Sequence, residues 1–108
     1  MTGVLIFTAM ELIKSNIKDY PGNHVNIETD NPNLEFEEAK DIARQRAKEL
    51  SLDPMLLSWF QGNTGESYPK MECGPGDIPA WMTYAESRGG DLVMNINRGQ
   101  YIFIYLSI

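Results

Sequence analysis

The most reactive side chain in this sequence is a single cysteine within a glycine-rich segment. Cys73 stands in Met71-Glu-Cys-Gly-Pro-Gly-Asp77, where the glycines would leave its thiol accessible to a substrate. A nucleophilic thiol needs a base, and His24 is the only histidine in the chain. The acidic neighbours Glu72 and Asp77 would disfavour the thiolate. Most lone cysteines are small buried hydrophobes, so catalysis by Cys73 with His24 as base is an alternative and not the leading hypothesis.

A metal site is a further alternative for the same side chains. His24, Cys73 and the carboxylates Glu28, Glu72 and Asp77 are all possible ligands. They are far apart along the chain, and no local spacing makes them converge. One cysteine and one histidine also exclude a cysteine-based zinc cage and histidine-rich metal sites within one chain. The sequence therefore assigns no metal ligands, and His24 is more simply a solvated loop residue.

A charged turn offers a candidate binding site. The segment Glu86-Ser-Arg-Gly-Gly-Asp91 combines an arginine, two carboxylates and flexible glycines. An exposed Arg88 could clamp a carboxylate or phosphate, so a small anionic ligand is one expected partner. The simpler interpretation of Glu86, Arg88 and Asp91 is a charged hairpin end. The chain has no phosphate loop, no dinucleotide-binding glycine pattern and no nucleophile elbow.

Two tryptophans flank a long segment, 61–80, that is rich in glycine and proline. Trp59 precedes it and Trp81 follows it, so together they could line a pocket or a dimer face. Loops of this length in small domains are functional, mobile or partly strand-forming. A plain hairpin pairing 59–61 with 68–72 is an equally good interpretation of the segment.

Hydrophobic periodicity indicates the elements that would position these residues. Alternation of Val25, Ile27 and Thr29 with polar residues predicts a strand. The clearest helix spans 34–51, with Asn33 as its cap and one apolar face. The residues expected on that face are Ala39, Ile42, Ala43, Ala47 and Leu50. A first helix is expected over 9–19, and the uniformly apolar 55–60 is interpreted as a strand because of its aromatic end.

The C-terminal third is interpreted as an antiparallel meander. The runs 81–86, 92–97 and 101–106 are rich in aromatic and aliphatic residues and are separated by glycine-containing turns. The last run lacks polar alternation, which is typical of a central strand covered on both faces. Together these elements predict one α+β domain over 1–108, with four to five mostly antiparallel strands and two helices packed on one face.

Charge and hydropathy exclude several classes of partner. The formal net charge is −6 and no run of basic residues stands out, so binding to nucleic acid is not expected. The apolar N-terminal stretch is too short for a membrane span and lacks the charged start of a signal peptide. A cytoplasmic protein without membrane contact is therefore expected.

The chain resembles a family of short, uncharacterised archaeal and anaerobic-bacterial proteins. The stretches that carry the resemblance are Val25–Asp30, Asn33–Ala39, Leu56–Phe60, Glu72-Cys73, Trp81–Gly90 and Tyr101–Tyr105. The resemblance implies a stand-alone cytoplasmic domain without an established activity, so it supplies no catalytic residues. It also implies a second cysteine in relatives where this chain has Gly74, which argues against a thiol-pair or metal role here.

The leading functional hypothesis is a small non-enzymatic binding or assembly domain that uses the 61–80 loop and the Arg88 turn. A sheet that is apolar on both faces but carries two helices on one face would leave the other uncovered, which favours a homo-oligomer. The runner-up is a small enzyme or thiol carrier that uses Cys73, His24 and Arg88. No cofactor is indicated by any motif.

Overall fold

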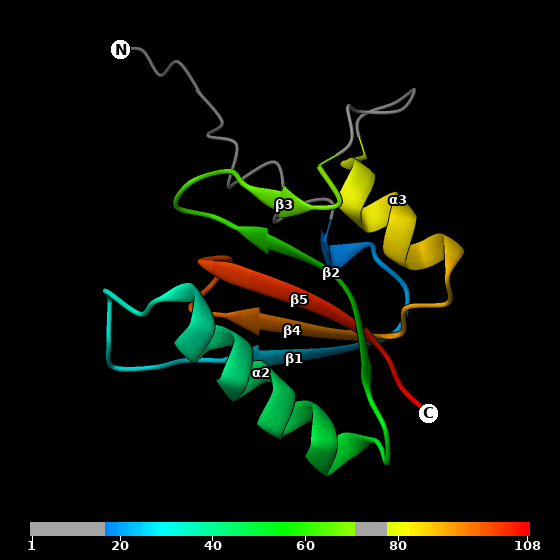
Figure 1. Ribbon diagram of the computed structural model, residues 1–108, viewed down its shortest axis with the longest axis horizontal. Coiled ribbons are helices and arrows are strands. Elements are labelled where there is room, and N and C mark those ends of the chain that lie inside the picture. The colour runs from blue at the N-terminus through cyan, green and yellow to red at the C-terminus, as the bar shows by residue number, and fades with distance from the viewer. Residues whose placement is uncertain (1–16, 71–77) are drawn as a thin grey trace.

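The computed structural model describes residues 17–70 and 78–108, which form a five-stranded mixed sheet with helices (Figure 1). The strand order is β1-β4-β5-β2-β3, in which β1 and β4 are parallel and the other neighbours are antiparallel. This confirms the α+β class with mostly antiparallel strands. The elements are β1 (Asn23–Ile27), α2 (Phe36–Leu50), β2 (Met55–Gln61), β3 (Ser67–Tyr68), α3 (Ala80–Ser87), β4 (Leu92–Ile96) and β5 (Tyr101–Leu106).

The middle of the sheet is the apolar strand β5, as its sequence predicts. β5 lies between β4 and β2, and its residues from Tyr101 to Tyr105 are all buried. Its side chains alternate between two core clusters, with Phe103 in one and Ile102 and Ile104 in the other. A strand that is buried on both faces has no solvent side to carry polar residues, which explains the uninterrupted apolar run.

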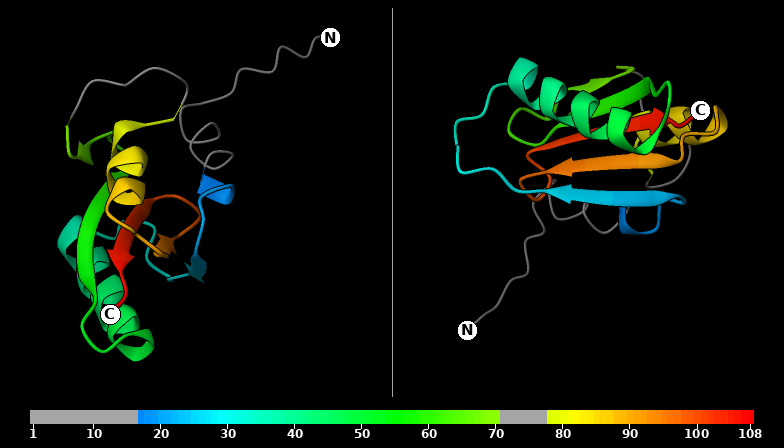
Figure 2. Two further views of the ribbon diagram at one scale, coloured as in Figure 1. Left: turned by 90° about the vertical axis from the view of Figure 1, so that its right-hand side faces the viewer. Right: turned by 90° about the horizontal axis from the view of Figure 1, so that it is seen from below.

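The helices α2 and α3 lie on opposite faces of the sheet (Figure 2). Ile17, at the described end of the expected helix 9–19, also packs on the α3 side, so the expectation that the two predicted helices share one face is wrong. Ala39, Ala43 and Ala47 of α2 pack in the cluster that contains Phe103. Trp81 and the rest of the apolar face of α3 pack in the cluster that contains Ile104. Both faces of β4 and β5 are apolar, so each face needs its own cover.

The N-terminus of α2 is set by two glutamates instead of the expected Asn33. Glu35 is the N-cap residue, and its backbone N–H donates to the Glu38 carboxylate over 3.4 Å. The helix therefore begins at Phe36, two residues after the expected start. At the other end, Leu50 is 42% exposed, so it does not belong to the buried face.

The segment predicted as the first strand of the meander is the helix α3. Pro79 is its N-cap residue, and the apolar residues Trp81, Met82 and Ala85 lie on its buried side. It ends at two glycines: Gly89 has a φ of +81°, and a Cβ on Gly90 would lie 2.8 Å from the Tyr20 hydroxyl. The meander is therefore reduced to the hairpin of β4 and β5.

The strand predicted at 55–60 is confirmed. A hairpin also begins the glycine-rich segment, but its second strand is Ser67–Tyr68 instead of the expected 68–72, of which residues 71 and 72 lie outside the described part of the chain. β2 pairs with β3 through Trp59 with Tyr68 and Phe60 with Ser67. A β-bulge between Leu56 and Ser58 shifts the register of β2 against β5. The Ser58 hydroxyl is fully buried here, without a hydrogen-bond partner among the described residues.

The strand expected over 25–29 from the alternation of apolar and polar residues is β1. It begins and ends two residues before the expected positions, at Asn23 and Ile27. β1 runs along the outer edge of the sheet, with Val25 and Ile27 packed against the α2 side. Of the expected helix 9–19, Ile17 and Lys18 are helical and the preceding residues lie outside the described part of the chain.

Candidate functional site

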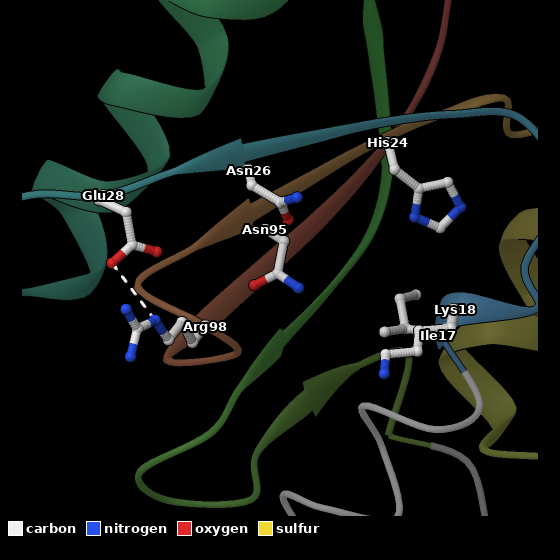
Figure 3. A pocket seen from close by; sticks show the side chains of 7 residues that line it. All are labelled: Ile17, Lys18, His24, Asn26, Glu28, Asn95 and Arg98. Atoms are coloured by element: carbon white, nitrogen blue, oxygen red, sulfur yellow. Dashed lines mark ion pairs between the residues drawn. The ribbon is translucent and has the colours of Figure 1, made fainter.

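A polar pocket of about 560 Å³ lies beside β1, on the face of the sheet opposite α2 (Figure 3). Its walls come from the turn before β1, from β1 and β4, and from the loop between β4 and β5. The lining residues are Ile17, Lys18, His24, Asn26, Glu28, Asn95 and Arg98. Apart from Ile17 they are charged or polar, so their donors and acceptors could orient a polar ligand.

Strand geometry explains why three of these side chains converge. Side chains alternate along a strand, so His24 and Asn26 point away from the face where Val25 packs. β1 and β4 are in parallel register, which places Asn26 opposite Asn95. Figure 3 shows His24, Asn26 and Asn95 projecting on the same side of the two strands.

Two of these side chains are oriented by hydrogen bonds to the backbone. The His24 Nε2 lies 2.7 Å from the Tyr20 carbonyl oxygen, which can only accept, so Nε2 is the donor of this hydrogen bond. The Asn95 Oδ1 accepts from the Gly99 N–H over 2.6 Å, which leaves the Asn95 amide group as a donor. Within the described chain, Asn26 and Lys18 make no side-chain hydrogen bond or ion pair.

Arg98 enters the pocket from a strained loop. Asn97 and Arg98 have φ values of +51° and +55°, in the left-handed region that non-glycine residues rarely adopt. Asn97 holds this conformation: its Oδ1 accepts from the Thr29 N–H over 2.7 Å, and its Nδ2 donates to Thr29 Oγ1 and Gln100 Oε1, both over 2.8 Å. The Arg98 Nε then lies 3.6 Å from a Glu28 carboxylate oxygen, in an exposed ion pair.

A second polar hollow, of about 510 Å³, lies on the other side of Glu28 and Arg98, which line both cavities. Its remaining walls include Asp30 and the amides of Asn63, Asn97 and Gln100. Among the described residues, two cations, Lys18 and Arg98, and one carboxylate line the first pocket, whereas two carboxylates and one cation line the second. The first pocket therefore favours an anion, although the whole chain has a net charge of −6.

Tyr20 joins the turn before β1 to the turn after α3. Its buried hydroxyl donates to the Gly90 carbonyl oxygen over 2.9 Å. Burial raises the pKa of this phenol to about 12, and the negative charges of Glu86 and Asp91 act in the same direction. Tyr20 thereby fixes the segment that supplies Lys18 and the carbonyl partner of His24.

The predicted catalytic pair is not assembled by the described residues. His24 lines the polar pocket, but Cys73 lies outside the described ranges, as do Glu72 and Asp77. Over 17–70 and 78–108, no group of three or more histidine, cysteine, aspartate or glutamate residues could hold a metal ion. Of the expected enzyme residues, Arg88 is also absent from the lining of the His24 pocket.

Arg88, the predicted anion-binding residue, lies at the C-terminal end of α3 and not at the tip of a hairpin. Arg88 follows α3, and its guanidinium carbon lies 3.6 Å from the centre of the Tyr84 ring. The Asp91 carboxylate binds Ser107 instead: it accepts hydrogen bonds from the Ser107 N–H and hydroxyl over 2.8 and 2.6 Å. Glu86 is exposed on α3 and forms no ion pair with Arg88.

The two tryptophans pack on different faces of the sheet. Trp81 is 3% exposed and stacks on Phe60, with ring centroids 5.2 Å apart. Trp59 is half-buried and contacts Phe36 of α2 at 4.7 Å between centroids. Neither tryptophan lines the two polar cavities. The pairing of Trp59 and Trp81 in one pocket is therefore wrong for the cavities formed by the described chain.

Sequence reasoning missed most residues of the pocket. Lys18, Asn26, Asn95 and Arg98 were not singled out as candidates. One signal was present: Asn95 interrupts the otherwise apolar strand Leu92-Val-Met-Asn-Ile96, and a polar side chain inside such a strand is an indicator of a functional position. The convergence of Asn26 with Asn95 depends on the parallel pairing of β1 with β4, which no local pattern encodes.

Comparisons with known proteins place these features in a family without an assigned function. A family model described as a domain of unknown function, DUF5619, matches residues 22–105. The crystal structure of protein AF1514 from Archeoglobus fulgidus DSM 4304 is similar, with a TM-score of 0.70 and 28% identity over 81% of this chain and 95% of that one. A search of curated proteins gives no match. None of the helices within 17–70 and 78–108 has the length and apolar character that crossing a bilayer requires.

Proposed function

The chain belongs to DUF5619, a family of domains of unknown function, and we propose that it is a binding domain for a small anionic ligand held in the polar pocket beside β1. The observation that carries this proposal is the convergence of Lys18, Arg98 and the Asn95 amide donor on one cavity. Ammonium, guanidinium and amide groups all donate to carboxylate or phosphate oxygens.

The rigidity of the Arg98 loop supports this proposal. The hydrogen bonds of Asn97 hold the loop before any ligand arrives, so binding would not have to order the backbone. The side chain of Arg98 is 80% exposed, which leaves most of its donors free for a ligand. A backbone held in a sparsely populated conformation is also a frequent feature of binding sites.

Glu28 indicates how an anion would enter. Its carboxylate lies 3.6 Å from the Arg98 Nε, which is a loose distance for a charge-assisted hydrogen bond. Both side chains are largely exposed, so this ion pair contributes little to stability. An incoming carboxylate or phosphate would compete with Glu28 for the guanidinium at a small cost.

The enzyme and thiol-carrier alternative has less support. It requires Arg88 near His24, whereas Arg88 stacks on Tyr84 at the end of α3 and is not part of the pocket. A cytoplasmic location also stays a proposal; the single cysteine, which rules out a disulfide within one chain, agrees with a reducing compartment.

The experiment is a titration of the full chain with inorganic phosphate, followed by the amide and arginine side-chain signals in nuclear magnetic resonance spectra. We expect saturable shifts at Asn26, Asn95 and Arg98. The variant Arg98→Gln should weaken binding about ten-fold, because a charge-assisted hydrogen bond is lost. The control Arg88→Gln removes an equal charge outside the pocket and should leave the affinity unchanged.

Two results would contradict the proposal. One is a linear, unsaturated response at the pocket residues up to high phosphate concentration. The other is equal weakening by Arg98→Gln and Arg88→Gln, which would reveal a response to overall charge and not to a site.

A further inference from the structure

The two edges of the sheet are protected to different degrees. Natural sheets protect their edge strands with short length, proline, lysine or bulges. The edge strand β3 has two residues and is followed directly by Pro69 and Lys70. At the other edge, β1 has five residues, Asn23-His-Val-Asn-Ile27, with neither proline nor lysine and no bulge against β4 (Figure 2). Among the described strands, β4 is its only neighbour.

The hydrogen bonds of β1 show which of its residues face the edge that carries no described strand. The Asn23 N–H donates to the Asp91 carbonyl oxygen, and the Ile27 carbonyl oxygen accepts from the Asn97 N–H, both over 2.8 Å. The backbone groups of these odd-numbered residues therefore point toward β4. Because alternate residues of a strand direct their backbone groups to opposite sides, those of His24, Asn26 and Glu28 point outward.

This edge is complementary to itself. An antiparallel pairing centred on Asn26 puts the Asn26 side chains of two copies side by side. It puts His24 of each copy opposite Glu28 of the other, so no two like charges face each other across the pairing. On the other face it puts Val25 opposite Ile27, two half-buried β-branched residues that suit a sheet.

We propose that two copies of this chain associate through their β1 edges, antiparallel and centred on Asn26, into one continuous sheet. The His24 and Asn26 side chains lie on the pocket face, so the pockets of the two copies would meet across the two-fold axis. This differs from the dimer expected from an uncovered apolar face, since the part of that face at β1 is polar. The pairing does not depend on anion binding.

The first test is the mass of the full chain in solution by light scattering, from low micromolar to millimolar concentration. We expect a rise toward twice 12.2 kDa. The variant Asn26→Pro should abolish the rise, because it removes an outward N–H at the centre of the pairing and spares the bonds to β4. The control Ser67→Pro changes the opposite edge strand and should leave the dimer intact.

A charge-swap series tests the register without proline. His24→Glu would place two carboxylates opposite each other at both ends of the pairing, and we expect the dissociation constant to rise about five-fold or more. Adding Glu28→Lys places opposite charges at both ends and should lower the dissociation constant again, to that of the unsubstituted chain or below it. Circular dichroism confirms that each variant is folded.

The outcomes separate clearly. A monomer at every concentration overturns the proposal. A dimer that persists in folded Asn26→Pro assigns assembly to another surface. If that variant unfolds, the charge-swap series decides: rescue by the double variant supports the register, and absence of rescue overturns it.

Discussion

Replacing Asn97 tests whether the loop that carries Arg98 is held by its side chain. The amide of Asn97 makes three hydrogen bonds, two with Thr29 and one with Gln100. At a net value of about 1 kcal/mol each, reduced by partial exposure, their loss costs about 2 kcal/mol. Alanine at a φ of +51° adds about 1 kcal/mol of backbone strain. We therefore expect Asn97→Ala to lower the free energy of unfolding by about 3 kcal/mol.

The matched variant Asn97→Gly separates the two contributions. Glycine loses the same hydrogen bonds but adopts a positive φ without strain, so the loss should be nearer 2 kcal/mol. Urea unfolding, monitored by the fluorescence of Trp59 and Trp81, measures both values. A change of less than about 0.5 kcal/mol in Asn97→Ala, or a larger loss in Asn97→Gly than in Asn97→Ala, would refute the reasoning.

Two further predictions concern buried hydroxyls. Ser58→Ala should raise the free energy of unfolding by about 1 kcal/mol, because it removes a buried hydroxyl without a partner. The control Ser107→Ala should lower it by about the same amount through the lost bond to Asp91. Urea unfolding measures both values, and a change of the opposite sign in either variant would contradict the prediction for that variant. Because the pKa of Tyr20 is raised, the protonated phenol stabilises the fold fully below pH 10, and this part of the free energy of unfolding is lost as pH rises toward about 12. Tyr20→Phe should therefore destabilise the fold at neutral pH and show a smaller alkaline loss; an unchanged alkaline loss would contradict the assignment.

The elements that the sequence predicts best are those whose burial is uniform or strictly periodic. The central strand β5 agrees with its prediction to the residue, because burial on both faces leaves an unbroken apolar run. The buried alanines of α2 follow helical spacing over 15 residues, enough for the period to be unambiguous. α3 has eight residues and two aromatic side chains, and over so short a length a helix and a strand share the same apolar pattern.

Most residues of the candidate site could not be predicted from local sequence pattern. His24 was identified as a possible functional residue, and it does line the pocket. Its neighbours come from three separate segments that only the sheet topology brings together. Arg98 belongs to a turn whose left-handed backbone depends on Thr29, which is 68 residues from Asn97 in the sequence. Arg88 and Asp91 were grouped because they are adjacent in the chain, whereas the fold gives them different partners.

The parallel pairing of β1 with β4 also has a consequence for the order of folding. The strands β4 and β5 are joined by a short loop, while the bond from Tyr20 to Gly90 closes a separation of 70 residues. Closing a large loop costs chain entropy before any contact compensates for it. We therefore expect β1 to dock onto β4 after the hairpin of β4 and β5 has formed. Because β1 forms one wall of the pocket, an anion bound there would hold β1 against β4, and occupancy would be coupled to local folding.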